Sequence, residues 1–290
     1  NRAPARIDAQ RFYLCFWRQR RLIAEENQDS GCQTLLKTVL CSVLTLCILP
    51  VLTQSAAASP ASELVTKVLF VGNSLTLRND LPGMLKEIAA TKGIQVQTST
   101  SAKGSARLEH HSGDTGLLQL MDETAWDFVV LQEHTQLPAM AKNDVDRDSL
   151  PFAAELATRA RQVSAETRVV FYMGMAHREG DQFNKKTLPA VGSYPGMQNR
   201  PNATYRRMAK DSNAMLAPVG EVWARMRAAH PGIELYVDER HPSVAGTYLA
   251  ACVFFTTLFS QSCASDFVPG ALEEVVATTI QQVSDASLLR

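Results

Sequence analysis

Short apolar runs alternate along residues 62–290 with longer segments in which apolar positions recur at helical spacing. The apolar and β-branched runs predict five strands, of which the last is short: 67–72, 94–98, 127–131, 168–173 and 215–220. Helical spacing predicts helices at 80–92, 115–124, 150–165, 202–213, 221–229, 243–259 and 271–283. Strands that alternate with helices imply a parallel sheet covered on both faces, so the expected class is α/β.

The first predicted strand ends in a turn of small residues that carries a serine. Residues 68–71 are apolar and lead directly into Gly72, Asn73 and Ser74. A buried strand that ends in this way can present a serine hydroxyl at the rim of a sheet. Because Gly and Asn also form ordinary turns, the pattern alone leaves a purely structural turn open.

A second segment, far along the chain, supplies a possible acid and base. Asp238 precedes His241 by three residues, and Pro242 and Ser243 follow. An Asp at this spacing can hold the imidazole while the ring accepts the proton of a serine. A solvated loop before the helix at 243–259 is the alternative interpretation.

Taken in this order, the two segments resemble the SGNH (GDSL-like) hydrolases, and the resemblance covers residues 67–259. Gly72-Asn73-Ser74-Leu75 stands where that family usually has Gly-Asp-Ser-Leu, and Asp238 and His241 match its last block. The resemblance implies a three-layer α/β/α sandwich around a central parallel sheet of five strands. It also implies a catalytic triad of Ser74, His241 and Asp238.

The same resemblance implies an oxyanion hole, for which the match is uneven. The backbone N–H of Ser74 is one expected donor, and that of Gly104 is another. The family's third donor, an Asn after the third strand, is missing here. Gln132 is the best substitute because its amide can donate the same kind of hydrogen bond. Glu133 and His134, which follow it, can equally be rim residues that face water.

The predicted strand order gives separate support for a shared site. Ser74, Gly104 and Gln132 follow the predicted carboxyl ends of the first three strands. Ligands of open parallel sheets bind outside these ends. The polar segment 179–201 is expected to cover this site and shape substrate choice, although an inert surface loop is the alternative.

Composition restricts the other classes of function. The chain has 290 residues, of which 46% are hydrophobic, which suffices for one sizeable core. Its net charge of zero does not indicate a nucleic-acid surface. Glu109, His110, His111 and Asp114 could in principle bind a metal, but a solvated helix entry is the favoured reading, and no metal or organic cofactor is expected.

The N-terminal part has the layout of a secretory signal peptide. Residues 35–58 combine a lysine, a short apolar core and an Ala-x-Ala site, which predicts cleavage near Ala58 and export to the periplasm or the medium. An uncleaved membrane anchor is the alternative. Residues 1–34 are interpreted as an upstream or non-native extension, and residues 62–290 as the hydrolase domain.

Of the six cysteines, only Cys252 and Cys263 lie within this domain. They are expected to be too far apart to form a disulfide, and Cys252 is expected to be a buried thiol.

The sequence therefore predicts an exported serine esterase that hydrolyses carboxylic esters of a small molecule or carbohydrate, without nucleic-acid partners or a membrane span after cleavage. Small acyl groups on carbohydrates are the first expected substrates, by resemblance and export alone. Two alternatives stay open. The same triad could transfer an acyl group to another sugar, or the protein could be a non-catalytic glycan-binding module, which the missing Asn favours.

Overall fold

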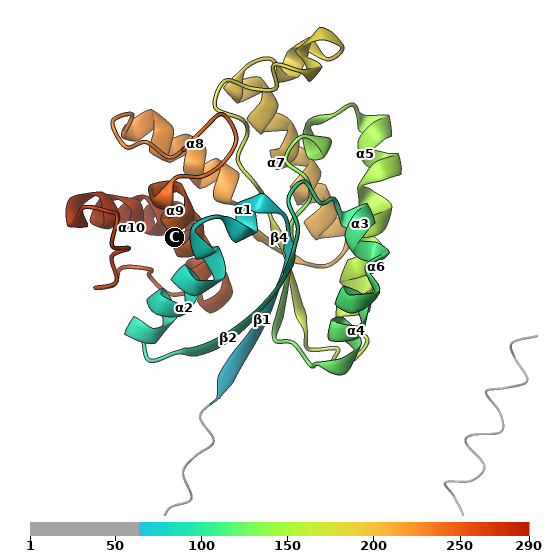
Figure 1. Cartoon of the computed structure of the whole chain (residues 1–290), viewed down its shortest axis with the longest axis horizontal. Coiled ribbons are helices and arrows are strands. Elements are labelled where there is room, and N and C mark those ends of the chain that lie inside the picture. Colours follow the sequence, from blue (N-terminus) through green and yellow to red (C-terminus); the bar gives the residue numbers. More distant parts are fainter. Residues whose placement is uncertain (1–63, 290) are drawn as a thin grey trace, which may run out of the picture. The chain divides into compact units, whose positions relative to one another are not determined.

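The computed structural model describes residues 64–289, which form an α/β sandwich around one parallel sheet (Figure 1). The strand order is β2-β1-β3-β4-β5, and every neighbouring pair is parallel. The strands are β1 (Val65–Gly72), β2 (Gln95–Ala102), β3 (Phe128–Leu131), β4 (Arg168–Tyr172) and β5 (Met215–Ala217). The predicted fold class is confirmed.

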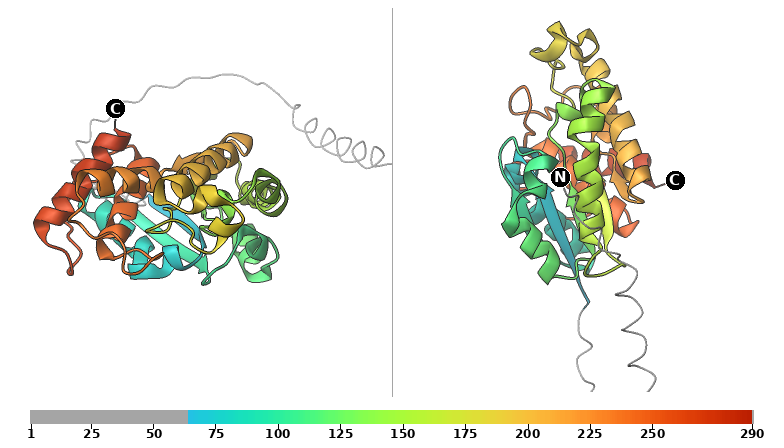
Figure 2. Two further views of the ribbon diagram at one scale, coloured as in Figure 1. Left: turned by 90° about the horizontal axis from the view of Figure 1, so that it is seen from above. Right: turned by 90° about the vertical axis from the view of Figure 1, so that its right-hand side faces the viewer.

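Successive residues of the central strands pack into two separate cores. Phe70, Val130 and Tyr172 face one core, whereas Val71 and Leu131 face the other. This alternation places helices on both faces of the sheet, as Figures 1 and 2 show. The first face carries α2 (Leu81–Thr91), α8 (Val219–Ala229), α9 (Val244–Phe259) and α10 (Glu274–Leu288). The second face carries α3 (Leu108–Ser112), α4 (Thr115–Glu123), α6 (Leu150–Ala160) and α7 (Tyr194–Asp211).

Helix α9 is buried almost all round, because it packs on the sheet while α2, α8 and α10 cover it. Phe254 lies edge-on to Phe70 and Tyr172, with ring centroids 5.5 and 5.0 Å apart. Near the start of the helix, a Cβ on Gly246 would lie 2.3 Å from the Leu235 carbonyl oxygen and 2.4 Å from Trp223. Only glycine therefore fits at this point, where the helix follows the loop that carries His241.

The order of the strands reverses at β1, which has β2 on one side and β3 on the other. In open α/β sheets such a switch point is where ligands bind. The short helix α1 (Ser74–Leu77) starts there, directly after β1. Residues 178–193, between β4 and α7, project beyond the same end of the sheet and include the short turns η3 (Asn184–Lys186) and η4 (Pro189–Val191) (Figure 1).

The observed elements differ from the predicted ones at several places: α1, α3 and α5 (Lys142–Asp148) were not predicted, and β2 and α7 have other bounds. Strand β2 continues to Ala102 because each of its residues has a parallel partner on β1, so this edge strand is polar yet paired along its whole length. Helix α7 begins at Tyr194 rather than at 202, because Ser193 caps it and Pro195 lies in its first turn, and the helix continues through Pro201. The predicted cover segment 179–201 is therefore partly helical.

The predicted extension and signal peptide, residues 1–34 and 35–58, lie outside the described residues. Within residues 64–289, no helix has the length and apolar character required to cross a membrane.

Candidate active site

Ser74 occupies the first turn of α1, at the carboxyl end of β1. The side chain of Asn73 caps this helix by accepting a hydrogen bond from the N–H of Leu75 at 3.2 Å. The N–H of Ser74 itself has no acceptor within residues 64–289. Its position at the first turn of a helix therefore leaves a donor free beside the Ser74 hydroxyl.

His241 joins Ser74 to Asp238 although the serine lies 167 residues away in the sequence. The His241 Nε2 atom lies 3.1 Å from Ser74 Oγ, and Nδ1 lies 2.8 Å from an Asp238 carboxylate oxygen. The other oxygen of Asp238 accepts hydrogen bonds from the N–H groups of Arg240 and His241, each at 2.7 Å. The structure thus brings the three predicted triad residues into one chain of contacts.

Asp238 is strongly stabilised in its ionised form. Burial acts to raise the pKa of this carboxyl, but the Arg240 N–H, the His241 ring and the His241 N–H outweigh it, so that its pKa lies well below the usual range. The group therefore stays negative over the whole range in which a histidine changes charge.

The loop that carries Asp238 and His241 is held in place from two sides. The guanidinium of Arg178 donates to the carbonyl oxygens of Tyr236 and Asp238 at 3.2 and 3.4 Å and pairs with Glu234 at 2.7 Å. On the opposite side, the Asn79 amide donates to the Pro242 carbonyl oxygen at 3.2 Å. These contacts fix the imidazole over Ser74.

A small cavity of about 90 Å³ opens beside the Ser74 hydroxyl. Its wall includes, besides Ser74 and His241, the side chains of Ser105, His134, His177 and Arg240. Apart from Leu75, all of the residues that line it are polar.

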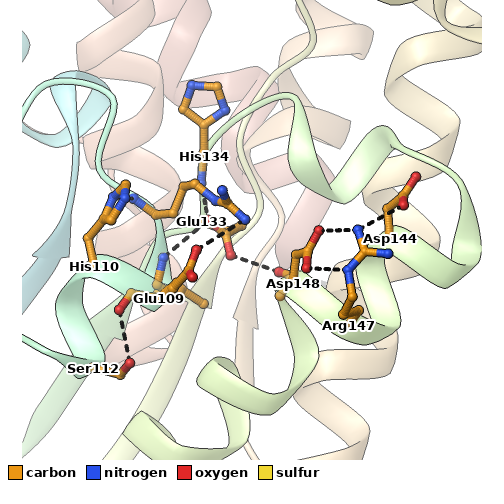
Figure 3. Close-up of polar contacts among 11 residues, drawn as sticks. Glu109, His110, Ser112, Glu133, His134, Asp144, Arg147 and Asp148 are labelled. Atoms are coloured by element: carbon orange, nitrogen blue, oxygen red, sulfur yellow. Dashed lines mark hydrogen bonds and ion pairs between the residues drawn. The ribbon is translucent and has the colours of Figure 1, made fainter. Parts of the chain in front are cut away.

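Glu133 lies under this cavity and does not line it. Its carboxylate accepts hydrogen bonds from the N–H groups of Leu108 and His134 at 3.2 and 2.6 Å and from the Ser149 hydroxyl at 2.8 Å. Figure 3 shows the carboxylate below the backbone of His134, whose ring points the other way. Burial raises the pKa of Glu133. Glu133 therefore joins three segments of the backbone, and the alternative that it is a rim residue facing water is excluded.

The residues considered as possible metal ligands have structural partners. His110 accepts the N–H of Arg107 at 3.1 Å, the buried ring of His111 donates to the Gly72 carbonyl oxygen at 2.8 Å, and Asp114 caps α4. Within residues 64–289 the structure contains no cluster of three or more side chains that could hold a metal ion.

Comparison with known proteins identifies the family. No protein-family model and no curated protein matches the sequence. Among solved structures, a protein from Slackia heliotrinireducens described as an SGNH hydrolase is 31% identical, with a TM-score of 0.54, over 67% of this chain and 100% of that one. The chain belongs to the SGNH hydrolase family.

Two further structures share the fold of this SGNH hydrolase. A DUF4886 family protein from Bacteroides uniformis has a TM-score of 0.68 at 17% identity, over 78% of this chain and 95% of that one. A GDSL-like lipase from Parabacteroides merdae has a TM-score of 0.50 at 14% identity, over 68% of this chain and 96% of that one. The predicted family and the predicted class of serine hydrolase are confirmed.

Gln132 does not occupy the position expected of the missing SGNH asparagine. The side chain is fully buried, and its amide nitrogen donates to Asn73 Oδ1 at 2.8 Å. Its oxygen accepts from the Asn73 N–H at 3.2 Å and from the Thr76 hydroxyl at 2.7 Å. The Gln132 amide is thus bonded to Asn73 and Thr76 and does not line the cavity. Its assignment as an oxyanion donor is therefore corrected.

Gly104 lies one residue away from the wall of the cavity. It is exposed, and a Cβ added there would meet no protein atom within 4 Å, so no contact among the described residues requires a glycine at this position. Ser105, with a φ of 60°, lines the cavity instead. The 104–105 turn of this SGNH hydrolase therefore reaches the site mainly through Ser105.

His134 and His177 are cavity residues that the sequence pattern did not assign. Burial is the main cause that lowers the pKa of both rings, and it brings that of His177 to about 4. His134 follows β3 and His177 follows β4, so each lies after the carboxyl end of a strand. This placement was the one signal in the sequence that could have pointed to His177.

The two cysteines of the described residues are free and buried. Burial, followed by the neighbouring Cys263 thiol, raises the pKa of Cys252. The chain reverses after α9 at Ser260, which has a φ of 54°, and this brings Cys263 back beside the helix. The buried thiol at Cys252 is confirmed, whereas the expected large separation is wrong.

Proposed function

We propose that this SGNH hydrolase is a serine esterase in which Ser74 is the nucleophile, His241 the general base and Asp238 the group that orients and stabilises the imidazolium. The observation that carries the proposal is the contact of His241 with both partners, at 3.1 Å to Ser74 Oγ and 2.8 Å to Asp238. Each distance is within hydrogen-bond reach, as proton transfer from a serine requires.

The proposed reaction has two steps. Ser74 Oγ attacks the ester carbonyl carbon as its proton moves to His241 Nε2, and the proton then passes to the departing alcohol. Water, deprotonated by His241, releases the acid from the acyl-enzyme and restores Ser74. Asp238, which stays ionised, stabilises the positive imidazolium in both steps.

The oxyanion is held by backbone donors. The N–H of Ser74 has no acceptor within residues 64–289 and stands next to the reacting hydroxyl. The 104–105 turn supplies the second donor, through the N–H of Gly104 or of Ser105, which likewise donate to no acceptor in the described part of the chain. Donors fixed in this way act on charge that develops in the transition state.

Small acyl groups are the proposed acyl part of the substrate, and carbohydrate the proposed alcohol. The cavity of about 90 Å³ beside Ser74 supports a short acyl chain, since a long one needs an apolar tunnel. Export, with cleavage near Ala58, rests on the signal-peptide pattern of residues 35–58.

Covalent labelling tests the proposal. A fluorophosphonate probe is expected to label the wild-type protein at Ser74 and to leave Ser74→Ala unlabelled, with Ser112→Ala as a control. A screen of 4-nitrophenyl esters then gives the acyl length, with acetate expected to exceed long-chain esters. Labelling of Ser74→Ala to the wild-type extent would refute the role of Ser74.

A further inference from the structure

The cavity beside Ser74 has an unusual balance of charge. None of the side chains that line it is a carboxylate, and Arg240 is its one permanently charged group. The buried carboxylate of Asp181 has other partners: it accepts hydrogen bonds from the amides of Gln136 and Asn184 at 2.8 and 2.6 Å. A bound ligand therefore meets one cationic side chain and no acidic one among the residues of this wall.

Arg240 has a fixed backbone and a free head group. Its N–H donates to Asp238 at 2.7 Å, which sets the position of its Cα next to the triad. Its guanidinium forms no ion pair and no hydrogen bond with residues 64–289, in contrast to Arg178 of the neighbouring segment, which is held by Glu234. The guanidinium is thus available to a ligand.

His177 is a second group in the same wall whose ring has no partner among the described residues. Its side chain is only 7% exposed, and neither ring nitrogen has a hydrogen-bond partner among the described residues. Burial is the main reason for its pKa of about 4; the charge of Asp181 acts in the opposite direction, and Arg240, His134 and His241 lower the pKa. The ring is neutral at neutral pH and offers one N–H that the protein itself does not use.

A ring N–H without an acceptor in the protein is free to donate to a ligand that enters the cavity. An unpaired guanidinium next to such a donor matches a carboxylate, whose two oxygens can accept from both groups at once. A cationic ligand, by contrast, finds no acidic side chain on this wall.

We propose that the substrate carries an anionic group, a carboxylate, which binds between Arg240 and His177 while Ser74 attacks the ester of the same molecule. The placement beside Ser74 rests on the proposed esterase function. Arg240 and His177 are then specificity residues, which select acylated acidic sugars over acylated neutral ones.

The test compares two ligands that differ only in a carboxylate in place of a hydroxymethyl group: methyl glucuronoside and methyl glucoside. Binding is measured by calorimetry on full-length Ser74→Ala, so that it does not depend on turnover. The charged ligand is expected to bind about tenfold more tightly, because a charge-assisted bidentate contact is stronger than a neutral one. This preference should decrease as salt is raised from ~0.01 to ~0.5 M.

Four further substitutions in the same background, one of them a control, show which residues cause the preference. Arg240→Gln is expected to remove most of the preference and Arg240→Lys to retain part of it, since lysine keeps the charge without the planar fork. His177→Phe, which keeps a ring without a donor, is expected to reduce it. Arg225→Gln removes an exposed arginine of α8 and should leave it unchanged. Equal affinities for the two glycosides, or a preference that survives Arg240→Gln, would overturn the proposal.

Acetate release from the O-acetylated forms of the same glycosides by the wild-type enzyme separates this inference from the proposed function. A higher kcat/KM for the acidic ester, through a lower KM, supports the carboxylate site. Equal kcat/KM values refute the carboxylate site while leaving the esterase intact. Preferential binding of glucuronoside without any acetate release refutes the esterase while leaving the carboxylate site intact.

Discussion

The side-chain amides of Asn73 and Gln132 are paired: Gln132 Nε2 donates to Asn73 Oδ1 at 2.8 Å. The same Asn73 oxygen also accepts from the N–H of Leu75, so it holds the first turn of α1 and the end of β3 together. Gly72, just before, leaves room for the Gln132 side chain, since a Cβ there would lie 2.5 Å from its Oε1. The Gly-Asn-Ser turn is therefore built on Gln132.

Gln132→Leu should mainly reduce stability. It leaves the buried N–H of Asn73 and the Thr76 hydroxyl without their acceptor, and each loss of this kind costs about 1–3 kcal/mol. Urea unfolding measures the change, and Gln97→Leu, at an exposed position of β2, serves as the control. An unchanged free energy of unfolding together with a large loss of kcat would instead restore Gln132 as an oxyanion donor.

Ser74→Ala should abolish ester turnover while leaving the fold intact. The expected loss of kcat is on the order of 10⁶-fold, as for other triads that lose their serine. The half-buried hydroxyl contacts His241 and carries little packing, so the melting temperature should stay close to that of the wild type. Retention of most of the activity with 4-nitrophenyl acetate would contradict the proposed mechanism.

His241→Ala should be nearly as damaging as Ser74→Ala, because both changes disable the same proton transfer. Asp238→Asn should cost less, since the carboxylate acts through the imidazole and is itself half-exposed. Because the pKa of Asp238 lies far below the range in which histidines titrate, activity should rise with pH along a single limb that belongs to the base. A kcat/KM that is flat from pH ~5 to ~8, with stability checked by circular dichroism, would argue against His241 as the base.

His177 should make the protein less stable in mild acid. Its pKa of about 4 in the folded protein lies below the ordinary value near 6.5, so the unfolded chain binds the additional proton between these limits. The free energy of unfolding should therefore fall as the pH decreases from ~6.5 to ~4, by up to a few kcal/mol for this group. His177→Phe should remove part of that slope, while His230→Gln should not. Equal slopes for wild type and His177→Phe would show that the buried ring is not the cause.

Gly246→Ala should lower stability by about 1–3 kcal/mol through overpacking. The new methyl group would press on the Leu235 carbonyl oxygen and on Trp223, at the start of α9. Gly232→Ala is the matched control, since a Cβ there meets nothing within 4 Å. Thermal denaturation followed by tryptophan fluorescence checks both variants, and equal melting temperatures would contradict the packing argument.

The parts of the site that depend on local pattern could be predicted from the sequence. Ser74 ends a buried strand and Asp238 and His241 share one short loop, and these patterns together with the SGNH resemblance grouped the three residues as a candidate triad. The direction of a side chain could not be predicted in this way. Gln132 follows its strand as expected, yet its amide turns inward, because Asn73 and Thr76 offer it partners there.

His177 was missed for a related reason. Nothing in its neighbourhood in the sequence resembles a motif, and it enters the cavity only because β4 ends beside β3 in the folded sheet. The polar strand β2 and the early start of α7 show the same limit. The length of β2 depends on its pairing with β1, and the start of α7 depends on the capping residue Ser193. Neither feature can be recognised in the pattern of apolar residues.

The Arg178 contacts have a consequence for the order of events when the enzyme is denatured. The loop of Asp238 and His241 is tied down by polar bonds near the surface, whereas Trp223 lies in the core with no exposed area. Hydrogen bonds near the surface break at denaturant concentrations at which the core is still folded. Loss of turnover should therefore precede the change in tryptophan fluorescence, and dilution of this early, inactive form should restore activity at once, without the delay that refolding requires.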